Sequence, residues 1–234
     1  MNKVQLHNKY QPLLLAKHNR YSIVTGGRGS GKSYGLTMYL LLLSMESNHV
    51  VLFTRYTMTS AQISIIPEFL EKIELLGLED MFHITKTEII NKQSGSKILF
   101  RGIRTSSGDQ TANLKSIQGV TTFVIEEAEE LVDESIFDKI DLSVRSIKRE
   151  NRTIIVMNPT TREHWVYKRF FESKGVRDGS NGSINGINYI HTTYLDNLAN
   201  LSKGVIDTME QMKVDDVENY NNVILGGWRA KAEG

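Results

Sequence analysis

The chain has 234 residues, of which 40% are hydrophobic and 24% are charged, and its formal net charge is +1. These values are ordinary for a globular protein and suit one large domain, or one domain with a small appendage. The sequence contains no cysteine, which excludes a disulfide framework and a thiolate metal site. It shows neither a signal-peptide core nor an apolar run long enough to span a bilayer, so we expect a soluble, non-secreted cytoplasmic protein without a membrane partner.

The first predicted strand, which ends in Ile23–Thr25, leads directly into a glycine-rich loop and then into an apolar helix. The loop consists of Gly26, Gly27, Arg28, Gly29, Ser30, Gly31, Lys32 and Ser33. These residues complete the G-x-x-x-x-G-K-[ST] pattern of a phosphate-binding P-loop, in the strand–loop–helix context that the pattern requires. Glycines let the backbone wrap around an anion, and the loop N–H groups and the following helix N-terminus attract phosphate.

This loop predicts the binding of ATP together with Mg²⁺. Lys32 can reach the β- and γ-phosphates, and the Ser33 hydroxyl can hold Mg²⁺. The alternative is a glycine-rich turn that merely joins a strand to a helix. Segments ahead of a P-loop strand often pack near the nucleotide base, so Gln11 could hydrogen-bond adenine. The alternative for Gln11 is a solvent-facing position in a lead-in helix.

The stretch after the loop alternates between helical and extended patterns. We expect a helix at 33–46, a buried strand at 49–54, a helix at 61–76 and a hairpin with strands at 82–91 and 97–101. The charged residues of the 61–76 helix, Lys72 among them, fall on the face opposite its apolar residues. Arg55 follows the 49–54 strand at a ligand-binding edge, where it could contact phosphate or DNA, or form a surface ion pair. Residues 102–119 are polar and predict a mobile loop.

Two adjacent carboxylates end the next predicted strand, at 121–125. A P-loop nucleotidase needs acids at such a strand tip, and we expect Glu126 to serve Mg²⁺ and Glu127 to polarise the attacking water. The usual metal-side residue is aspartate, so Glu126 implies a longer reach, with room for a water between carboxylate and metal. We expect Glu129 and Glu130 in the solvated first turn of a helix. The alternative for the whole cluster is an acidic helix start without a metal role.

The second half of the chain continues the alternation. We expect a helix at 133–146, a strand at 153–157, an aromatic helix at 165–171, a strand at 188–194 and two short helices within 201–225. Asn158 follows the 153–157 strand, where its amide could sense the γ-phosphate; the alternative is a turn asparagine before proline. A basic cluster between helix and strand forms a solvated turn or a patch facing DNA or a neighbour: Arg145, Lys148, Arg149 and Arg152. Residues 175–186 are rich in Gly, Ser and Asn and predict a disordered loop.

Several of these motifs are similar to one known family. The segments GGRGSGKS, VIEEAEEL and IIVMNPT, the last followed by HWVYKRFF, resemble the ATPase domain of the large terminase subunit of tailed bacteriophages. HTTYLDN and VILGGWRA resemble it too, so the resemblance covers nearly the whole chain and depends on the order and spacing of the motifs. It implies an α/β P-loop NTPase fold of the ASCE, RecA-like class, with a mostly parallel sheet flanked by helices and a small helical C-terminal lid.

The resemblance also implies a function and partners. The protein would be a Mg²⁺-dependent ATPase motor of the host cytoplasm that packages double-stranded DNA into procapsids. It would work with the portal protein and the small terminase subunit as a homo-oligomeric ring, or be a monomer when isolated. A P-loop core would cover residues 1–194 and a lid or linker residues 195–234. The C-terminal nuclease domain of the family is absent, through truncation or natural splitting, so we expect no DNA cleavage.

The resemblance keeps the phosphate, metal and catalytic roles assigned above and makes Asn158 the residue that couples hydrolysis to movement. Arg28, inside the loop, could stabilise transition-state charge in cis. An arginine from a neighbouring subunit is also expected. The sequence leaves three candidates for it: Arg101, Arg104 and Arg145.

Three other functions of P-loop proteins are alternatives for this chain. A helicase or recombinase-type ATPase that moves along nucleic acid would normally need a second motor domain, for which 234 residues leave no space. A small-molecule kinase would need an arginine-rich lid, and residues 201–225 contain no arginine. A non-hydrolysing nucleotide-binding scaffold would not need Glu127.

Overall fold

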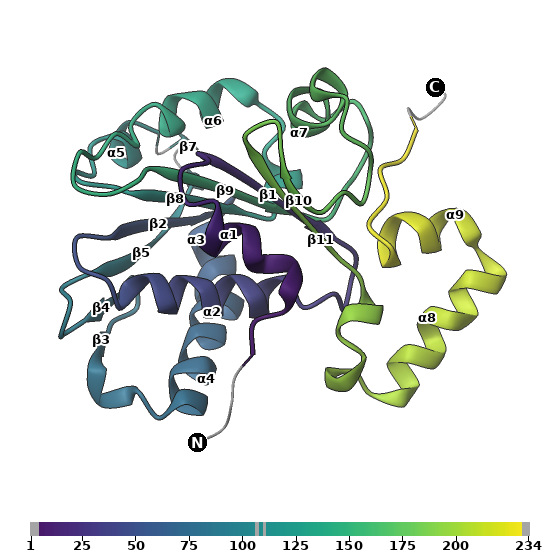
Figure 1. Cartoon of the computed structure of the whole chain (residues 1–234), viewed down its shortest axis with the longest axis horizontal. Coiled ribbons are helices and arrows are strands. Elements are labelled where there is room, and N and C mark those ends of the chain that lie inside the picture. The colour runs from purple at the N-terminus through teal and green to yellow at the C-terminus, as the bar shows by residue number, and fades with distance from the viewer. Residues whose placement is uncertain (1–4, 106–107, 110, 231–234) are drawn as a thin grey trace.

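A computed structural model describes residues 5–105, 108–109 and 111–230 of the chain. Within these residues, a nine-stranded sheet has the order β10-β11-β1-β9-β8-β2-β5-β4-β3 (Figure 1). Its strands are β1 (Tyr21–Gly26), β2 (Val50–Arg55), β3 (Phe82–Ile84), β4 (Glu88–Asn91), β5 (Lys97–Gly102), β8 (Thr122–Glu126), β9 (Arg152–Met157), β10 (Gly182–Ile184) and β11 (Ile187–Thr192). Neighbouring strands from β11 to β5 are parallel, whereas β10, β4 and β3 add antiparallel edges. The expected mostly parallel α/β sheet is confirmed.

Helices cover both faces of this sheet, as a buried parallel sheet requires (Figure 1). One face carries α1 (Gln11–Leu15), α2 (Lys32–Ser44) and α4 (Ile66–Leu76), and the other carries α5 (Thr111–Lys115), α6 (Glu134–Asp141) and α7 (Trp165–Phe170). The remaining helices are α3 (Met58–Ser60), α8 (Lys203–Asp215) and α9 (Val217–Asn219). No helix in the described part of the chain is both long and apolar enough to serve as a membrane span.

Two hydrophobic cores follow from the alternation of side chains along each strand. In β9, Ile154 and Val156 join the core beneath α2 and α4, while Ile155 and Met157 join the core beneath α6 and α7. Successive residues of a strand point to opposite faces, so an uninterrupted apolar strand supplies both cores at once. This double burial fixes the central strands and holds their carboxyl ends in register.

Some predicted elements differ from the observed ones. The predicted disordered loop at 175–186 is wrong at its end, because β10 pairs with β11 through Asn185 and Gly186, which both have positive φ. Asn-Gly is a strong hairpin signal, and it marked this turn in the sequence. The predicted strand at 82–91 divides into β3 and β4, and the predicted helix at 61–76 starts as a π-helical turn, Ala61–Ile65.

The predicted loop at 102–119 also contains regular structure. A small hairpin, β6 (Arg104–Thr105) and β7 (Gly108–Asp109), lies beyond the end of β5, and α5 follows it. Positions 106, 107 and 110 of this predicted loop lie outside the described residues. The segment is therefore only in part the irregular loop that its polar composition predicts.

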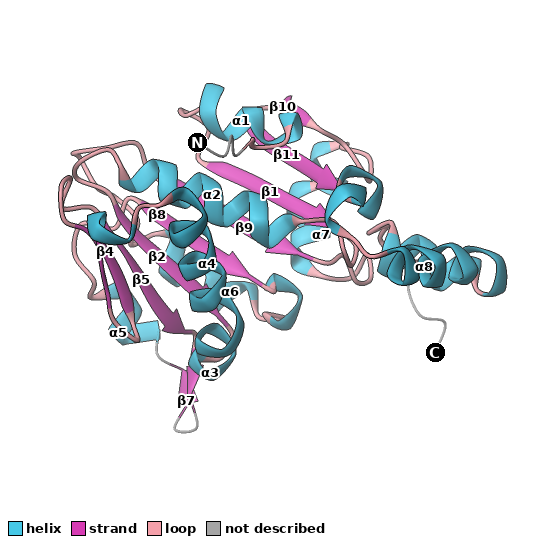
Figure 2. Ribbon diagram, turned by 90° about the horizontal axis from the view of Figure 1, so that it is seen from below, coloured by secondary structure: helices cyan, strands magenta, loops and turns pink. Residues whose placement is uncertain are grey.

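The C-terminal helices α8 and α9 lie beside the sheet (Figure 1), and α8 extends away from it (Figure 2). They enclose a small third core built from Tyr194, Met209, Tyr220 and Ile224. Trp228, further along the chain, returns to the core beneath α6 and α7. The division between a core over residues 1–194 and a lid over residues 195–234 stays a prediction.

The strand order brings three separate motifs together. β9 pairs with β1 on one side and with β8 on the other, and all three run in the same direction. The P-loop follows β1, Asn158 follows β9, and Glu126 ends β8. In open α/β sheets, ligands bind at the carboxyl ends of the strands. The sheet thus places Asn158 between the glycine-rich loop and the acids.

Candidate functional site

The P-loop backbone has a shape that favours glycine at several positions. Gly29 and Gly31 have φ of 73° and 76°, in the left-handed region that glycine adopts without strain. A Cβ on Gly26 would lie 2.3 Å from the Thr192 carbonyl oxygen, so the loop also packs too closely for a side chain there. The helix α2 begins at Lys32, and its N-terminus therefore faces the space that the loop encloses.

Lys32 lies at the centre of this loop. Its Nζ donates to the carbonyl oxygens of Gly26 at 3.2 Å and Gly27 at 3.0 Å, and to Asn158 Oδ1 at 2.6 Å. Burial lowers the pKa of Lys32 to about 8, while Glu129 and Glu126 nearby oppose this change. Asn158 therefore reaches the P-loop lysine directly from the neighbouring strand.

The two acids at the tip of β8 share one cation. Arg55 Nε lies 2.8 Å from Glu126 Oε2, and Arg55 Nη1 lies 3.4 Å from Glu127 Oε1. Ser33 Oγ donates to Glu126 Oε1 at 3.1 Å, which places the two predicted Mg²⁺ ligands side by side. Glu126 is buried, and this burial raises its pKa although Arg55 counteracts the effect.

Glu127 differs from its neighbour in both exposure and backbone shape. Its side chain is 44% exposed, and its φ of 53° lies in the left-handed region, where a glutamate is strained. This backbone turns the chain sharply after β8. A strained residue at a strand tip beside a ligand cavity fits a functional position better than a purely structural one.

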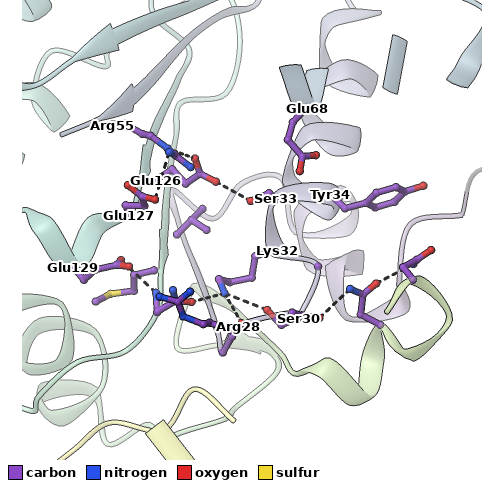
Figure 3. Close-up of a pocket in the computed structure, with 18 of the residues that line it drawn as sticks. Arg28, Ser30, Lys32, Ser33, Tyr34, Arg55, Glu68, Glu126, Glu127 and Glu129 are labelled. Atoms are coloured by element: carbon purple, nitrogen blue, oxygen red, sulfur yellow. Dashed lines mark hydrogen bonds and ion pairs between the residues drawn. The ribbon is translucent and has the colours of Figure 1, made fainter. Parts of the chain in front are cut away.

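One cavity of about 650 Å³ joins these groups (Figure 3). The residues that line it are Gly27, Arg28, Gly29, Ser30, Gly31, Lys32, Ser33, Tyr34, Arg55, Glu68, Glu71, Lys72, Glu126, Glu127, Glu129, Val156, Met157, Asn158, Asn197 and Asn200. The P-loop side of the cavity carries Arg28 and Lys32, and the acidic side carries carboxylates together with Arg55. This arrangement suits a polyphosphate that carries a divalent cation on its acidic side.

The structure brings the predicted loop, acids and amide together, but not every predicted residue. Arg28 lines the cavity, and its exposed side chain makes no hydrogen bond or ion pair with the described residues. Gln11 is exposed at the start of α1 and lines neither this cavity nor the one beside it. That neighbouring cavity, of about 430 Å³, shares Ser30 and Gly31 with the P-loop and is lined by Gln5 instead.

The three arginines predicted to act on a neighbouring subunit all lie outside the lining of their own chain's cavity. Arg101 is in β5 and donates to the carbonyl oxygens of Phe100 and Thr87. Arg104 follows it in β6 and donates to the Tyr56 hydroxyl at 2.7 Å. Arg145 is exposed in the turn between α6 and β9, near the amino ends of the strands. Their roles stay predictions.

Three residues differ from the expectations drawn from the sequence. Glu129 does not lie in a solvated helix turn; it lines the cavity, and its Oε2 accepts a hydrogen bond from the Asn158 backbone at 3.3 Å. Arg55 forms the expected ion pair with carboxylates, but it does so as a buried residue that lines the cavity and not at the surface. Lys72 is also buried, between Glu68, Glu71 and the Tyr34 ring. The surroundings of each of these three residues come in part from elements that are distant in the sequence and meet only in the folded chain.

Comparison with known proteins gives consistent results. A family model described as phage terminase large subunit matches residues 18–227. The large terminase subunit of Bacillus phage SPP1 is 29% identical over 247 residues, a match that covers 97% of this chain and 54% of the SPP1 protein. The chain spans about half the length of the curated relatives it matches.

Solved structures share the fold. The large terminase of a thermophilic bacteriophage superposes with a TM-score of 0.73 at 16% identity, covering 96% of this chain and 54% of that one. The same terminase has also been solved in complex with ATP-gamma-S and with ADP. The ATPase domain of the Thermus phage P74-26 large terminase gives a TM-score of 0.59 at 16% identity and covers 95% of this chain and 98% of that domain.

Proposed function

Since this chain belongs to the phage terminase large subunit family, we propose that it is an ATPase motor domain that hydrolyses ATP to drive double-stranded DNA into procapsids. The observation that carries the proposal is the single cavity that joins Lys32 and Ser33 to Glu126 and Glu127. The complexes of the thermophilic bacteriophage large terminase with ATP-gamma-S and with ADP support nucleotide as the ligand.

The triphosphate would occupy the space between the P-loop and the acids. Loop N–H groups would bind the phosphate oxygens, and Lys32 would exchange its bonds to loop carbonyls for bonds to phosphate. The adjoining cavity of about 430 Å³ would take the base and ribose, with Tyr34 between the two cavities and Gln5 in place of Gln11. The Arg28 side chain, which makes no hydrogen bond or ion pair with the described residues, is available to the γ-phosphoryl group in cis.

The donor set fits Mg²⁺ held by nucleotide and protein together. Ser33 and Glu126 offer one hydroxyl and one carboxylate oxygen 3.1 Å apart. Mg²⁺ is usually bound by one or two such protein groups together with substrate phosphates. When bound, the ion would neutralise charge on the β- and γ-phosphates. Burial raises the pKa of Glu126, and the adjacent Arg55 keeps the carboxylate available as a ligand.

Glu127 would act as the general base. Its carboxylate is half exposed to the cavity, so it can accept a proton from a water that attacks the γ-phosphorus. Asn158, between the lysine and the acids, would register the presence of the γ-phosphate through its side-chain amide. An arginine of a second copy would complete the site in a ring on the portal, with Arg101, Arg104 and Arg145 as candidates.

The proposal is tested by replacing Lys32 with alanine. Binding of a fluorescent ATP analogue and release of phosphate are measured for the wild-type chain, for Lys32→Ala and for Lys203→Ala. The last is a matched control, because Lys203 is exposed on α8 and pairs only with Asp207 among the described residues. We expect Lys32→Ala to lose turnover and to bind at least about tenfold more weakly, since a charge-assisted contact to phosphate disappears. Unchanged binding and turnover would refute the assignment.

A further inference from the structure

Glu129 occupies a position that its neighbour Glu130 does not share. Both lie in the 3₁₀ turn Ala128–Glu130 that follows the strained Glu127. Glu129 is half-buried and lines the phosphate cavity, and it also lines a second cavity of about 730 Å³ on the far side of the turn. Glu130 is exposed and lines neither cavity. Two adjacent glutamates therefore offer a matched comparison.

A chain of contacts runs from Glu129 to the P-loop. Glu129 Oε2 accepts from the backbone N–H of Asn158 at 3.3 Å. Asn158 Oδ1 accepts from Lys32 Nζ at 2.6 Å, and the same Nζ donates to the Gly26 and Gly27 carbonyl oxygens. Glu129 is thus the residue of the acidic turn that contacts Asn158, and Asn158 in turn contacts Lys32.

We propose that Glu129 is a positioning residue of the phosphate site: it holds the backbone of Asn158, and through Asn158 and its own charge it places Lys32. This inference rests on the proposed ATPase function. When Lys32 turns to a phosphate, the Asn158 amide is released, and Glu129 keeps the Asn158 backbone where that amide can still reach the nucleotide. Because the same turn carries Glu127, Glu129 ties the sensing amide to the catalytic base.

Charged groups face Glu129 from each element around it. Lys32 faces it from α2 and Glu127 from the end of β8, and the Asn158 N–H reaches it from β9. The buried His164, at the start of α7, faces the backbone of the same turn. The second cavity adds further charged residues: Glu134, Glu163, Lys168 and Arg169.

Ionisation of Glu129 should therefore appear in the pH dependence of turnover. Burial raises the pKa of Glu129 to about 7, with the charge of Glu127 adding to the effect and Lys32 opposing it. Above that pH the carboxylate is charged and attracts Lys32; below it the group is neutral and the attraction is lost. We expect kcat of the wild-type chain to fall as the pH drops through about 7.

The experiment compares Glu129→Gln, Glu129→Ala and the control Glu130→Gln. The values of kcat and KM for ATP are measured from about pH 6 to about pH 8.5. We expect Glu129→Ala to lower kcat about tenfold with a much smaller change in KM, because positioning acts on the transition state more than on binding. Glu129→Gln should keep an acceptor for Asn158, lose the fall in kcat near pH 7, and have a kcat between those of wild type and Glu129→Ala. Glu130→Gln should match the wild type.

A second measurement does not depend on turnover. Acetic anhydride labels Lys32 in the nucleotide-free chain at pH 7, and peptide mass spectrometry follows the rate. Without the charge of Glu129 the pKa of Lys32 falls, so Glu129→Gln should be labelled up to about tenfold faster, and Glu130→Gln at the wild-type rate. The inference is overturned if Glu129→Gln has both the pH profile and the labelling rate of the wild type. It is also overturned if Glu129→Ala changes kcat and KM equally. If the wild-type chain shows no turnover, the proposed function fails, and the labelling rates still decide the role of Glu129.

Discussion

Arg55 is the residue on which the acidic side of the site depends. It is buried and contacts Glu126 at 2.8 Å and Glu127 at 3.4 Å, and its Nη1 donates to Ser64 Oγ at 2.7 Å. Two carboxylates at one strand tip would repel each other and lose hydration if they had no counter-charge. The planar guanidinium offers separate N–H groups in a fixed geometry to both acids and to a hydroxyl, whereas a lysine would have to serve all three from one nitrogen.

Replacing Arg55 by alanine should destabilise the folded chain in a pH-dependent way. We expect a loss of about 3 kcal/mol in the free energy of unfolding at pH 7, because a buried carboxylate remains without its partner. The pKa of Glu126 is already raised by burial and should rise further in the variant. A protonated carboxyl needs no counter-charge, so the loss should be smaller at pH 5 than at pH 7. Urea unfolding at both pH values measures it, and an equal loss at both would contradict this role for Arg55.

At the scale of elements, the C-terminal segment Tyr220–Gly227 packs directly on the P-loop. The Arg28 backbone N–H donates to the Val223 carbonyl oxygen at 2.8 Å. His191 of β11 links Thr25, just before the loop, to the Leu225 carbonyl oxygen, with both contacts at 2.8 Å. The Arg28 contact joins two backbones and cannot adjust by side-chain rotation, whereas His191 links the same segments through its side chain. We therefore expect a change in the loop backbone to shift the segment that follows α8 and α9.

Gly27 makes this contact possible because it has no side chain. A Cβ on Gly27 would lie 1.9 Å from the Ile224 carbonyl oxygen and 2.7 Å from that of Val223. Gly27→Ala should therefore separate the two segments, lower the free energy of unfolding by about 1–3 kcal/mol and weaken nucleotide binding. Gly204→Ala on α8 is the matched control, since no atom outside the adjacent backbone of its own helix lies within 4 Å of its Cβ, and it should stabilise the chain by up to about 1 kcal/mol. Thermal unfolding measures both; a Gly27→Ala variant as stable as the wild type would refute the close contact.

Local signals were sufficient for the elements that carry the chemistry. The P-loop pattern, the apolar strands β8 and β9 and the residues that follow them were predictable, because glycine geometry and uninterrupted apolar runs act over a few residues. The order of the strands in the sheet depends on contacts between distant parts of the chain, and it determines which side chains meet in the cavity. Glu129 is half-buried only because β9 lies beside β8, and the sequence alone presents it as one more acid of an acidic run.

Burial of charged groups was the other feature that local patterns missed. Helical spacing assigns Lys72 to the polar face of α4, yet it is 3% exposed because Tyr34 and two glutamates surround it. Gln11 was chosen for its place ahead of β1, but α1 leaves it at the surface and the preceding segment supplies Gln5 to the cavity. The error for Lys72 concerns packing between elements and not the identity of an element, and the exposed Gln11 agrees with the solvent-facing alternative that the sequence left open.

At the scale of the whole molecule, the P-loop cavity lies at one edge of the sheet, and the candidate arginines lie at different edges. Arg101 and Arg104 are at or beyond the carboxyl end of β5, the same edge as the P-loop, whereas Arg145 precedes β9 at the opposite edge. None of them lines the cavity of its own chain. If turnover needs one of these arginines, a second copy of the chain must supply it. The fraction of chains in contact with another copy then rises with protein concentration.

The most direct test is the steady-state ATPase rate per chain as a function of protein concentration, with and without double-stranded DNA, for the wild type and for Glu127→Gln. We expect a rate that rises with concentration in the wild type. We expect Glu127→Gln to bind a fluorescent ATP analogue normally and to show no turnover, because the glutamine cannot accept a proton from water. A wild-type rate in Glu127→Gln would contradict the assignment of this site as the place where ATP is hydrolysed.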